Sequence, residues 1–362
     1  MAFASIPEAL ELFREGEMLI IVDDEDRENE GDLAIAADKI TPEIINFMAT
    51  HGRGLICLAL APEICDRLDL KLMSPENTSN FGTNFTESVD AVDGISTGIS
   101  SFDRAHTIRV AMSREVLPQD LARPGHMFPL RAKEGGVLVR AGQTEAVVDL
   151  ARIAGLGQGG VICEIMSPDG SMSRLPELKE FAQTHQLKII SVADLIRHRL
   201  QHERFIQRIA ESSVTNEFGT FRAVSYLSAV DQRAHLALVY GDKFQEPDLV
   251  RVQRLDGDVF HAVALNNTVR GSLAEIVANG SGAIVFLQLT GHPQTGPLLH
   301  EAGIGAQILA DLGLHRVRLL TNHPRKIVGL EGYGIEVVAQ SRIQDGKGNF
   351  QPASVSQTSI SS

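Results

Sequence analysis

Ten consecutive residues near the start of the chain are mostly acidic. Residues 23–32 read DDEDRENEGD, with seven carboxylates and a single arginine, Arg27. An apolar segment at 18–22 precedes the run and a mixed apolar segment at 33–36 follows it, which is the pattern of two strands joined by a loop. Like charges at this density repel one another unless a cation lies among them. The run therefore predicts a loop at the rim of a sheet and a candidate site for a divalent metal.

The acidic run has two other interpretations besides a metal site. A solvated surface loop explains a charge run equally well when the run is taken alone. A calcium hand is excluded, because its bidentate acid at the twelfth position falls on Ala37 when Asp26 is taken as the first position.

Composition bounds the class of protein. A chain of 362 residues is long enough for two domains, and its net charge of -13 argues against a nucleic-acid partner. Cys57, Cys65 and Cys163 form no CxxC pair, which favours reduced thiols. No apolar run reaches membrane-spanning length and the N-terminus has no targeting pattern. We expect a soluble cytoplasmic protein that binds neither nucleic acid nor membrane.

The pattern of strands and helices changes once along the chain. Up to about residue 200, strand-like segments at 54–60 and 160–165 alternate with amphipathic helices, one of them at 43–50 with Thr41 as its N-cap. A helix that starts at Ser191 and runs toward residue 212 is the expected connector. A second series follows, with strands at 236–240, 283–287 and 317–320 and a helix at 303–312. The predicted parts are a first domain at 1–203, a linker at 204–219, a second domain at 220–345 and a disordered tail at 346–362.

Three segments of the first domain have side chains suited to chemistry. His126 lies between turn residues and apolar ones, and Glu164 lies in the apolar strand 160–165, where it serves general acid–base catalysis or faces outward. Thr144 is the expected cap of a helix whose free N–H groups favour an anion, and Arg140 precedes it. A phosphate site and an ordinary capped helix with a surface arginine both fit that segment. Hydroxyls and amides at 77–86 and 94–104, Thr97 among them, are typical of a polyol pocket.

Taken in order, these segments resemble the 3,4-dihydroxy-2-butanone 4-phosphate synthase family over about residues 5 to 200. The resemblance implies an α+β fold, in which a mixed-sheet synthase domain precedes a second α/β domain. It also implies a homodimer whose active site is completed by both subunits, Mg²⁺ or Mn²⁺ as cofactor, and D-ribulose 5-phosphate as substrate. The motifs are DDEDRENEGDL at 23–33, HGRGLICL at 51–58, Asp103–Arg104, RPGHMFPL at 123–130 and GVICEI at 160–165.

The resemblance also assigns roles to residues. Catalysis falls to His126 and Glu164, and Asp23 is a further candidate for proton transfer. Glu28 is implied as a metal ligand. The remaining expected substrate contacts are Arg27, Asp32, Cys57, Thr97, Arg140, Ala141, Gly142 and Thr144.

One position departs from the family pattern. The family usually has Arg-x-Gly-His-Thr-Glu-Ala, with the histidine as second metal ligand, and this chain has Gln143 there. Magnesium is a hard ion that favours oxygen, so an amide carbonyl is an acceptable replacement. We expect retained activity, through a metal-stabilised enediolate, with an altered metal preference.

The second half resembles GTP cyclohydrolase II over about residues 220 to 345, through LVRV at 249–252, GDVF at 257–260, GIGAQIL at 303–309 and TNHPRKIVGLEGYG at 321–334. The zinc-binding cysteines of that family correspond to a shortened stretch at 254–255 and to Leu265 and Asn267, so no zinc is expected. The family's phosphate motif is replaced at 288–293, and Leu298 and His300 stand where an acid and an arginine are expected. We predict an inactive domain.

Three functions are compatible with the sequence. The first is conversion of D-ribulose 5-phosphate to L-3,4-dihydroxy-2-butanone 4-phosphate and formate in riboflavin biosynthesis. The second is a bifunctional enzyme that also opens GTP, for which Thr321 and Lys326 remain at GTP-contacting positions. The third is a non-catalytic regulator. The intact first site, beside a second site that has lost its ligands, favours the first.

Overall fold

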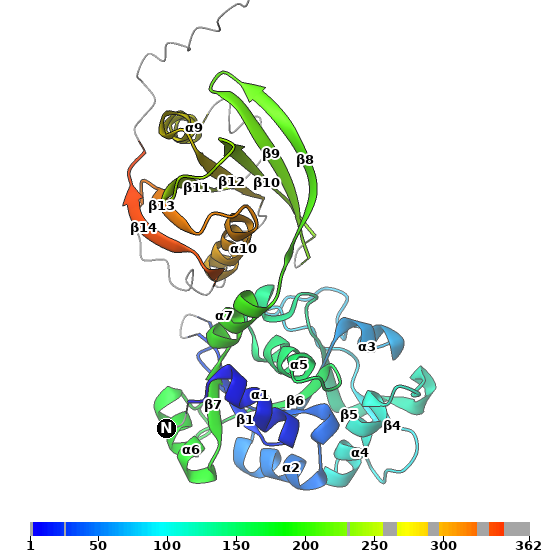
Figure 1. Cartoon of the computed structure of the whole chain (residues 1–362). Helices are drawn as coiled ribbons and strands as arrows, with labels where there is room; N and C mark the ends of the chain where they lie inside the picture. The colour runs from blue at the N-terminus through cyan, green and yellow to red at the C-terminus, as the bar shows by residue number, and fades with distance from the viewer. Residues whose placement is uncertain are drawn as a thin grey trace, which may run out of the picture. The chain divides into compact units, whose positions relative to one another are not determined.

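The chain divides into two compact units, Met1–Arg199 and Leu200–Ser362 (Figure 1). The computed structural model describes residues 3–24, 27–229, 232–255, 266–288, 297–323 and 333–343, with the backbone alone at 297–302. The tail predicted to be disordered, 346–362, lies outside these residues. The expected mixed α/β class holds for both units, each of which has its own sheet.

The first domain has a seven-stranded mixed sheet in the order β4-β5-β3-β6-β2-β1-β7. Pairs β3·β5 and β1·β7 are parallel and the other neighbours are antiparallel. The strands are β1 Leu19–Val22, β2 Gly31–Ala36, β3 Cys57–Leu60, β4 Val89–Ala91, β5 Leu121–Arg131, β6 Gly159–Glu164 and β7 Lys188–Ser191. The helices are α1 Ile6–Glu15, α2 Pro42–Phe47, α3 Pro62–Arg67, α4 Ser101–Met112, α5 Gln143–Ile153, α6 Leu175–His185 and α7 Val192–His202.

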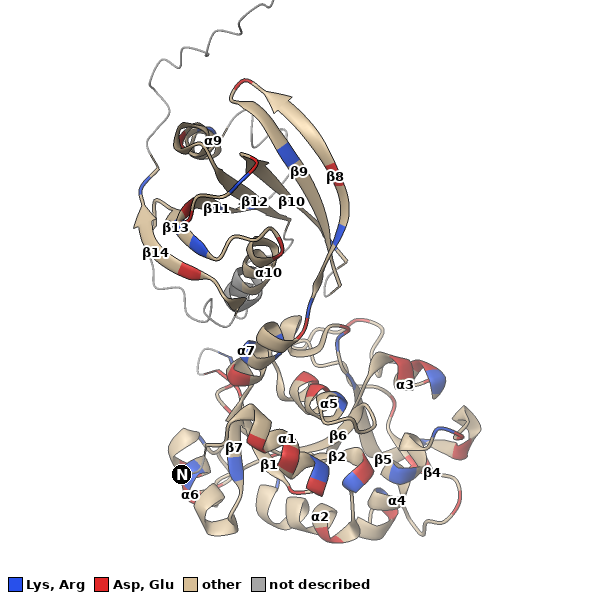
Figure 2. Cartoon of the chain, viewed as in Figure 1, with Lys and Arg blue, Asp and Glu red and all other residues tan. Residues whose placement is uncertain are grey.

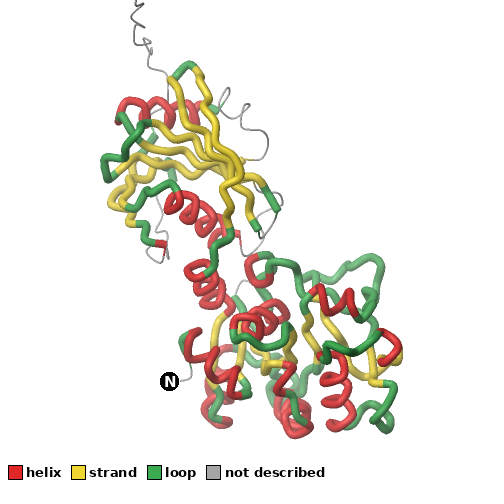
Figure 3. Tube along the Cα trace, turned by 45° about the vertical axis from the view of Figure 1, so that its right-hand side comes forward, coloured by secondary structure: helices red, strands yellow, loops and turns green. Residues whose placement is uncertain are grey.

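Both faces of this sheet are covered. Every residue of β1 and β2 is buried, and alternate residues of a strand point to opposite faces. Ile45 of α2, Ile108 of α4 and Leu178 of α6 share one core with Ile20 and Leu33 of the sheet. Helix α5 packs on β2, β3 and β6 and contacts α1. Figure 3 shows the strands of this domain enclosed by helices.

Local sequence signals explain where the elements begin. The Thr41 hydroxyl accepts a hydrogen bond from the Ile44 N–H at 3.3 Å, which confirms the predicted cap of α2. The acidic run joins β1 to β2, as predicted from the apolar segments on either side. The helix predicted to run toward residue 212 ends at His202 instead.

The second domain also has a seven-stranded sheet, in the order β14-β13-β11-β12-β10-β9-β8. Helices α9 and α10 cover opposite faces, each with its own core (Figure 1). Its strands are β8 Ile206–Asn216, β9 Gly219–Ser228, β10 Ala234–Tyr240, β11 Asp248–Leu255, β12 Gly282–Gln288, β13 Arg316–Leu320 and β14 Glu336–Ser341, and its described helices are α9 Asn267–Asn279 and α10 Pro297–Asp311.

The segment expected to be a linker is part of this second sheet. Residues 206–216 form β8, which pairs antiparallel with β9 along its length. Most of β8 is exposed, because it is an edge strand with one neighbour. Its polar sequence therefore reads as a linker, although the backbone is fixed by pairing with β9.

Charge is distributed over both units. Figure 2 shows acidic and basic residues interspersed along the ribbon of each domain. Among the described residues, no helix is long and apolar enough to cross a membrane.

A buried ion pair joins α5 to α7. The Arg199 guanidinium donates to Asp149 Oδ2 at 2.8 Å and to the Gly135 carbonyl at 2.8 Å, and the side chains of the ion pair are each 6% exposed. Burial raises the pKa of the Asp149 carboxyl, and Arg199 opposes that shift. The interaction fixes the C-terminal helix of this domain on α5.

We predict that Arg199→Met lowers the free energy of unfolding of the first domain by ~3 kcal/mol, because Asp149 stays buried and keeps only Arg152, whose nitrogen is 3.7 Å away and whose side chain is 36% exposed. Arg197→Met is the matched control on the same helix. Its ion pair with Asp194 is 41% exposed on both sides, so its loss costs about 0–1 kcal/mol. Calorimetry of the first unfolding transition measures both values, and equal effects would contradict the prediction.

Candidate active site

Asp23 organises the acidic loop from within. Its side chain is fully buried and accepts hydrogen bonds from the N–H groups of Glu28 at 3.2 Å and Glu30 at 2.9 Å. It also accepts one from Arg27 Nη1 at 2.6 Å. Arg174 donates to the Glu28 carbonyl at 2.7 Å and to the carbonyl of Asn29. These contacts hold residues 27–30 against the buried Asp23 carboxylate and Arg174, which is not the arrangement of a freely solvated loop.

The Arg27 guanidinium lies between the two residues expected to bind metal. Its Nη1 donates to Gln143 Oε1 at 3.1 Å, and its Nη2 lies 2.6 Å from Glu28 Oε1. The Arg27 side chain is 8% exposed. Gln143 is buried, and its Nε2 has no hydrogen-bond partner. Two expected metal-ligand positions that are far apart in sequence are thus brought together around one guanidinium.

The donor set suits a hard divalent ion. Glu28 and Gln143 offer oxygen, and magnesium needs only one or two protein oxygens because it keeps several waters. Among the described residues, no group of three or more His, Cys, Asp or Glu side chains is arranged to hold a metal. The oxygen atoms of Glu28 and Gln143 are of the kind that magnesium prefers as ligands.

Two arginines converge where α5 begins. A Cβ atom placed on Gly142 would lie 2.5 Å from Arg140 Nη1 and 2.9 Å from Arg27 Nη2. Arg140 also donates to Glu145 Oε2 at 2.6 Å and to Thr83 Oγ1 at 2.7 Å. Two guanidinium groups beside a helix N-terminus are the arrangement expected of the anion site that the sequence predicts.

Thr144 does not cap this helix as predicted. Gly142 is the N-cap and has no side chain to accept a hydrogen bond, and Thr144 is a buried residue of the first turn. The free N–H groups of the turn are therefore left for a ligand instead of a protein side chain. Ala141, next to the cap, is partly buried.

Carboxylates oppose one another across β2 and β6. Asp32 pairs in register with Glu164, so both side chains point to the same face. Burial, and then the negative charges of Glu164 and Glu28, raise the pKa of the Asp32 carboxyl well above its ordinary value. Glu164 Oε2 accepts a hydrogen bond from the Leu55 N–H at 2.8 Å. Cys57, two residues further along β3, is buried, and burial raises the pKa of its thiol, which keeps it protonated.

His126 is oriented by Asp90, a residue the sequence did not single out. Its Nδ1 lies 2.7 Å from Asp90 Oδ2, and its backbone N–H donates to Asp90 Oδ1 at 2.9 Å. The neighbouring strands approach closely at Gly125, where a Cβ atom would lie 2.0 Å from the Val89 carbonyl carbon. The imidazole is 43% exposed, so its other nitrogen is available to a ligand.

Asp103 shapes the loop that contains Thr97. Its carboxylate accepts hydrogen bonds from the Ser96 N–H at 3.0 Å, the Ser96 hydroxyl at 2.7 Å and the Gly98 N–H at 3.0 Å. The hydrogen bonds from Ser96 lower the pKa of the Asp103 carboxyl to about 2. Thr97 is exposed. The hydroxyls of 94–104 thus mainly fix the loop, and Gly98 lies against the His126–Asp90 pair.

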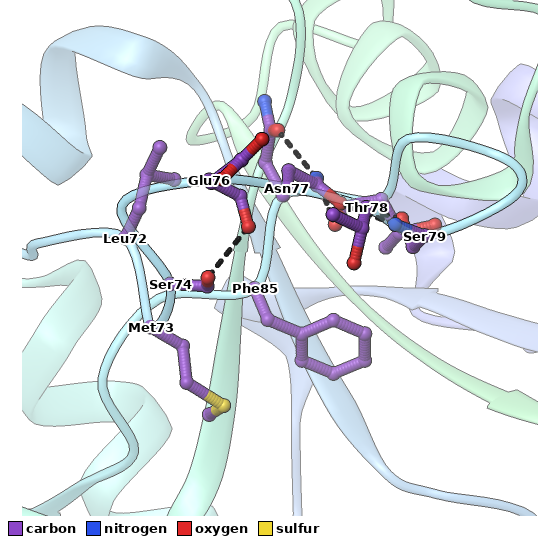
Figure 4. Close-up of a pocket in the computed structure, with 10 residues that line it drawn as sticks. Leu72, Met73, Ser74, Glu76, Asn77, Thr78, Ser79 and Phe85 are labelled. Carbon is purple, nitrogen blue, oxygen red and sulfur yellow. Dashed lines mark hydrogen bonds between the residues drawn. The ribbon is translucent and has the colours of Figure 1, made fainter.

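The amide-rich segment 77–86 borders a cavity of ≈ 320 Å³ (Figure 4). Its polar groups pair largely within the loop: Asn77 Oδ1 accepts from the N–H and hydroxyl of Ser79, and Asn77 Nδ2 donates to the Thr83 carbonyl. Arg140 donates to the Phe81 carbonyl at 3.0 Å. This loop therefore lies beside the anion site and supports Arg140.

The predicted site residues at this end of the sheet fall into two groups, a cluster around Arg27 and the pair formed by His126 of β5 and Glu164 of β6. Asp23, Arg27, Glu28, Arg140, Gly142 and Gln143 form one cluster, joined by the contacts above. Phe128 of β5 pairs with Cys57 of β3, and the two strands are parallel. His126, two residues before Phe128, is therefore level with Leu55, two residues before Cys57. Glu164 binds Leu55 from the next strand, so His126 and Glu164 are two strand spacings apart, roughly 10 Å.

Three residues that hold expected site groups in place, Asp90, Asp103 and Glu145, were given no role from the sequence. Asp90 could have been found as an acid inside a short apolar strand, and Glu145 as an acid that follows the predicted anion site. Asp103 was noted only as part of a motif, because nothing local indicates which N–H groups it binds.

Comparison with known proteins identifies the family. The sequence profile of 3,4-dihydroxy-2-butanone 4-phosphate synthase matches residues 7–198, and that of GTP cyclohydrolase II matches 207–296 and 291–342. The riboflavin biosynthesis protein RibBA of Aquifex aeolicus is 47% identical, over 94% of this chain and 93% of its own. The chain belongs to the 3,4-dihydroxy-2-butanone 4-phosphate synthase family. Its predicted enzyme class, a lyase of riboflavin biosynthesis, is confirmed by these relatives.

Further members of this synthase family support the assignment. A 3,4-dihydroxy-2-butanone 4-phosphate synthase of Pseudomonas aeruginosa is 43% identical, over 93% of this chain and 98% of its own. The crystal structure of RibBX, a two-domain synthase from A. baumannii, superposes with a TM-score of 0.82 at 40% identity, over 94% of this chain and 100% of its own. A synthase solved with two magnesium ions covers 56% of this chain and 99% of its own at 41% identity, with a TM-score of 0.53.

The second domain has ordinary core and helix residues at two expected zinc-ligand positions. Leu255 is buried in the core beside α9, and Asn267 is the first residue of α9, capped by Asn266. Leu265, Lys326 and the segment 289–293 lie outside the described residues, as do the side chains of Leu298 and His300.

We predict that Asp90→Asn lowers kcat by roughly 100-fold or more, because it weakens the hold on the His126 imidazole during proton transfer. The pH profile should change as well, since an amide does not stabilise an imidazolium ion. Asp93→Asn is the control, because Asp93 is an exposed acid close by in the sequence. An Asp90→Asn enzyme with the kcat and pH profile of the control would refute the orienting role.

Asp32 makes the metal-free protein sensitive to alkali. Because the pKa of Asp32 is raised in the folded state, the folded state binds more protons than the unfolded one above about pH 4, where a free aspartate ionises. Ionisation of Asp32 therefore lowers the free energy of unfolding progressively as pH rises from about 4 through the folded pKa, and has no effect below about pH 4.

We predict that Asp32→Asn is more stable than the parent at neutral and alkaline pH in metal-free buffer, and that the difference vanishes below about pH 4. Thermal unfolding across this pH range in the presence of a chelator measures it. A variant that is less stable at pH 8 than at pH 4, relative to the parent, would contradict the sign.

Proposed function

We propose that the first domain converts D-ribulose 5-phosphate to L-3,4-dihydroxy-2-butanone 4-phosphate and formate. The observation that supports this most directly is the convergence of Arg27 and Arg140 on Gly142. It provides an anion site next to two oxygen ligands and a row of buried carboxylates. A phosphorylated sugar whose hydroxyls and carbonyl reach Glu28 and Gln143 satisfies all three parts at once.

The phosphate is held by Arg140, the N–H groups of the first turn of α5 and the Thr144 hydroxyl. Arg140 is fixed by Glu145 and by the loop residues Phe81 and Thr83, so little side-chain entropy is lost when the anion binds. Thr97 and Cys57 border the sugar, the first as an exposed hydroxyl and the second as a neutral thiol.

Glu28 and Gln143 would hold a magnesium or manganese ion. Such an ion supplies electrostatic stabilisation of the negative charge that develops on the sugar oxygens when a proton leaves the adjacent carbon. No zinc is required by the residues of the first domain.

Proton transfers fall to residues at the ends of neighbouring strands. Glu164 lies opposite Asp32, and the raised pKa of Asp32 lets this pair share one proton and exchange it with the sugar. His126, oriented by Asp90, serves the other side of the substrate. Asp23 accepts three donors from its own loop, so we assign it to positioning Arg27 and Glu28.

The second domain is proposed to be inactive as a cyclohydrolase. Its equivalents of the zinc-binding cysteines include no thiolate, and zinc cannot activate water without ligands. Weak GTP binding through Thr321 is the residual activity compatible with the sequence. A bifunctional enzyme and a non-catalytic regulator are the alternatives, and the assay below distinguishes them.

The functional unit is proposed to be a cytoplasmic homodimer. An exposed His126 and an exposed Thr97 are compatible with a site that a second subunit completes.

We predict that the protein with magnesium releases labelled formate from ribulose 5-phosphate carrying ¹³C at C4, and none from GTP labelled at C8, with or without added zinc. NMR of the formate carbon measures both reactions in one buffer. Label from GTP would establish the bifunctional alternative.

Gln143→His is the companion variant, expected to release formate with a lower metal requirement. If the parent released no formate and Gln143→His did, the proposed retention of activity would be wrong.

A further inference from the structure

Arg27 occupies the position that a cation between Glu28 and Gln143 would take. One guanidinium nitrogen contacts Gln143 Oε1 at 3.1 Å and the other lies 2.6 Å from Glu28 Oε1. The side chain is almost fully buried. The protein thus supplies an internal positive charge to the oxygens that the proposed function assigns to a divalent ion.

The orientation of the Gln143 amide follows from this contact. A guanidinium only donates hydrogen bonds, so the atom facing Arg27 must be the amide oxygen. The amide nitrogen then points elsewhere and is left buried without a partner. The single oxygen of the Gln143 side chain therefore accepts a hydrogen bond from Arg27.

We propose that Arg27 and a divalent cation are alternative occupants of the Glu28–Gln143 site, so that metal binding requires Arg27 to release both oxygens. The inference rests on the proposed function for the location of the metal. A divalent ion placed on the same two atoms, Glu28 Oε1 and Gln143 Oε1, would repel the guanidinium strongly in a buried site. Arg27 acts here as a competitor for the metal in addition to its proposed contact with the sugar.

The anion site provides the destination for the released arginine. Arg27 Nη2 already lies 2.9 Å from the Cβ position of Gly142, beside Arg140, and its guanidinium is 5.5 Å from the ring of Phe81. A phosphate bound at the start of α5 attracts Arg27 away from Glu28 and Gln143. Anion and metal therefore bind cooperatively, the metal entering as the anion draws the arginine aside.

The test measures Mn²⁺ binding by the full chain from the loss of the free-ion electron paramagnetic resonance signal. Arg27→Lys keeps the charge but has no fork to reach both oxygens. Arg27→Gln removes the charge too. Breaking one charge-assisted hydrogen bond corresponds to roughly tenfold in affinity, so both variants are expected to bind Mn²⁺ about tenfold tighter or more without any anion present.

A matched control separates competition from net charge. Arg53→Gln removes one positive charge near Glu164 without touching Glu28 or Gln143, because Arg53 donates to the Ser167 carbonyl and is exposed. It is expected to leave Mn²⁺ affinity nearly unchanged. Far-ultraviolet circular dichroism verifies that each variant is folded.

Sulfate tests the coupling. The parent is expected to bind Mn²⁺ more tightly as sulfate is added, while Arg27→Lys shows little further gain.

Weaker or unchanged Mn²⁺ binding by Arg27→Lys would overturn the proposal and make Arg27 a support for Glu28. Equal tightening in Arg53→Gln would overturn it as well, by reducing the effect to net charge. Formate release by the parent is measured separately, so loss of that activity would refute the proposed function while leaving the order of Mn²⁺ affinities to judge the competition.

Discussion

The first domain must keep several carboxylates close together at one end of its sheet. Asp23, Asp32 and Glu164 come from different strand ends, and Glu28 and Glu30 from the loop between two strands. Burial raises the pKa of Glu28, Glu30 and Asp32, so each ionised group there costs folding free energy. Arg27 offsets part of that cost through its contacts with Asp23 and Glu28. The conformation of residues 27–30 and the position of the Gln143 side chain both depend on that guanidinium.

This arrangement separates residues that hold the site from those that do chemistry. The carboxylates of Asp23 and Asp103 accept hydrogen bonds from backbone N–H groups of their own loops. The Asp90 carboxylate contacts the backbone N–H and the imidazole of His126. Glu145 is committed to Arg140 and to the Lys133 N–H. Glu164 and Asp32 face each other across β6 and β2, and the proposed function assigns proton transfer to them.

Much of the first domain could be predicted from the sequence, because its strands are short apolar segments and its loops contain unusual side chains. The acidic run was placed between two strands on the basis of the flanking residues alone. Long-range partners were not predictable: Asp90 meets His126 across 36 residues, and Glu164 meets Leu55 across 109. Strand β8 was missed because an exposed edge strand has no apolar alternation to identify it. Gly142 was missed as a cap because a cap without a side chain gives no signal beyond glycine itself.

The replacement at position 143 has a consequence for how the site can be regulated. A buried amide has one oxygen to offer, and in the metal-free state Arg27 takes it. The guanidinium then supplies a positive charge to the site. It does not replace the metal, since a guanidinium has no vacant coordination position for a sugar oxygen. If the phosphate group of the sugar displaces Arg27, the metal binds tightly only after a phosphorylated substrate has bound. If the metal bound without substrate, the carboxylates of the site could abstract protons from other carbonyl compounds. A site that binds metal only together with a phosphate group favours proton abstraction from phosphorylated substrates.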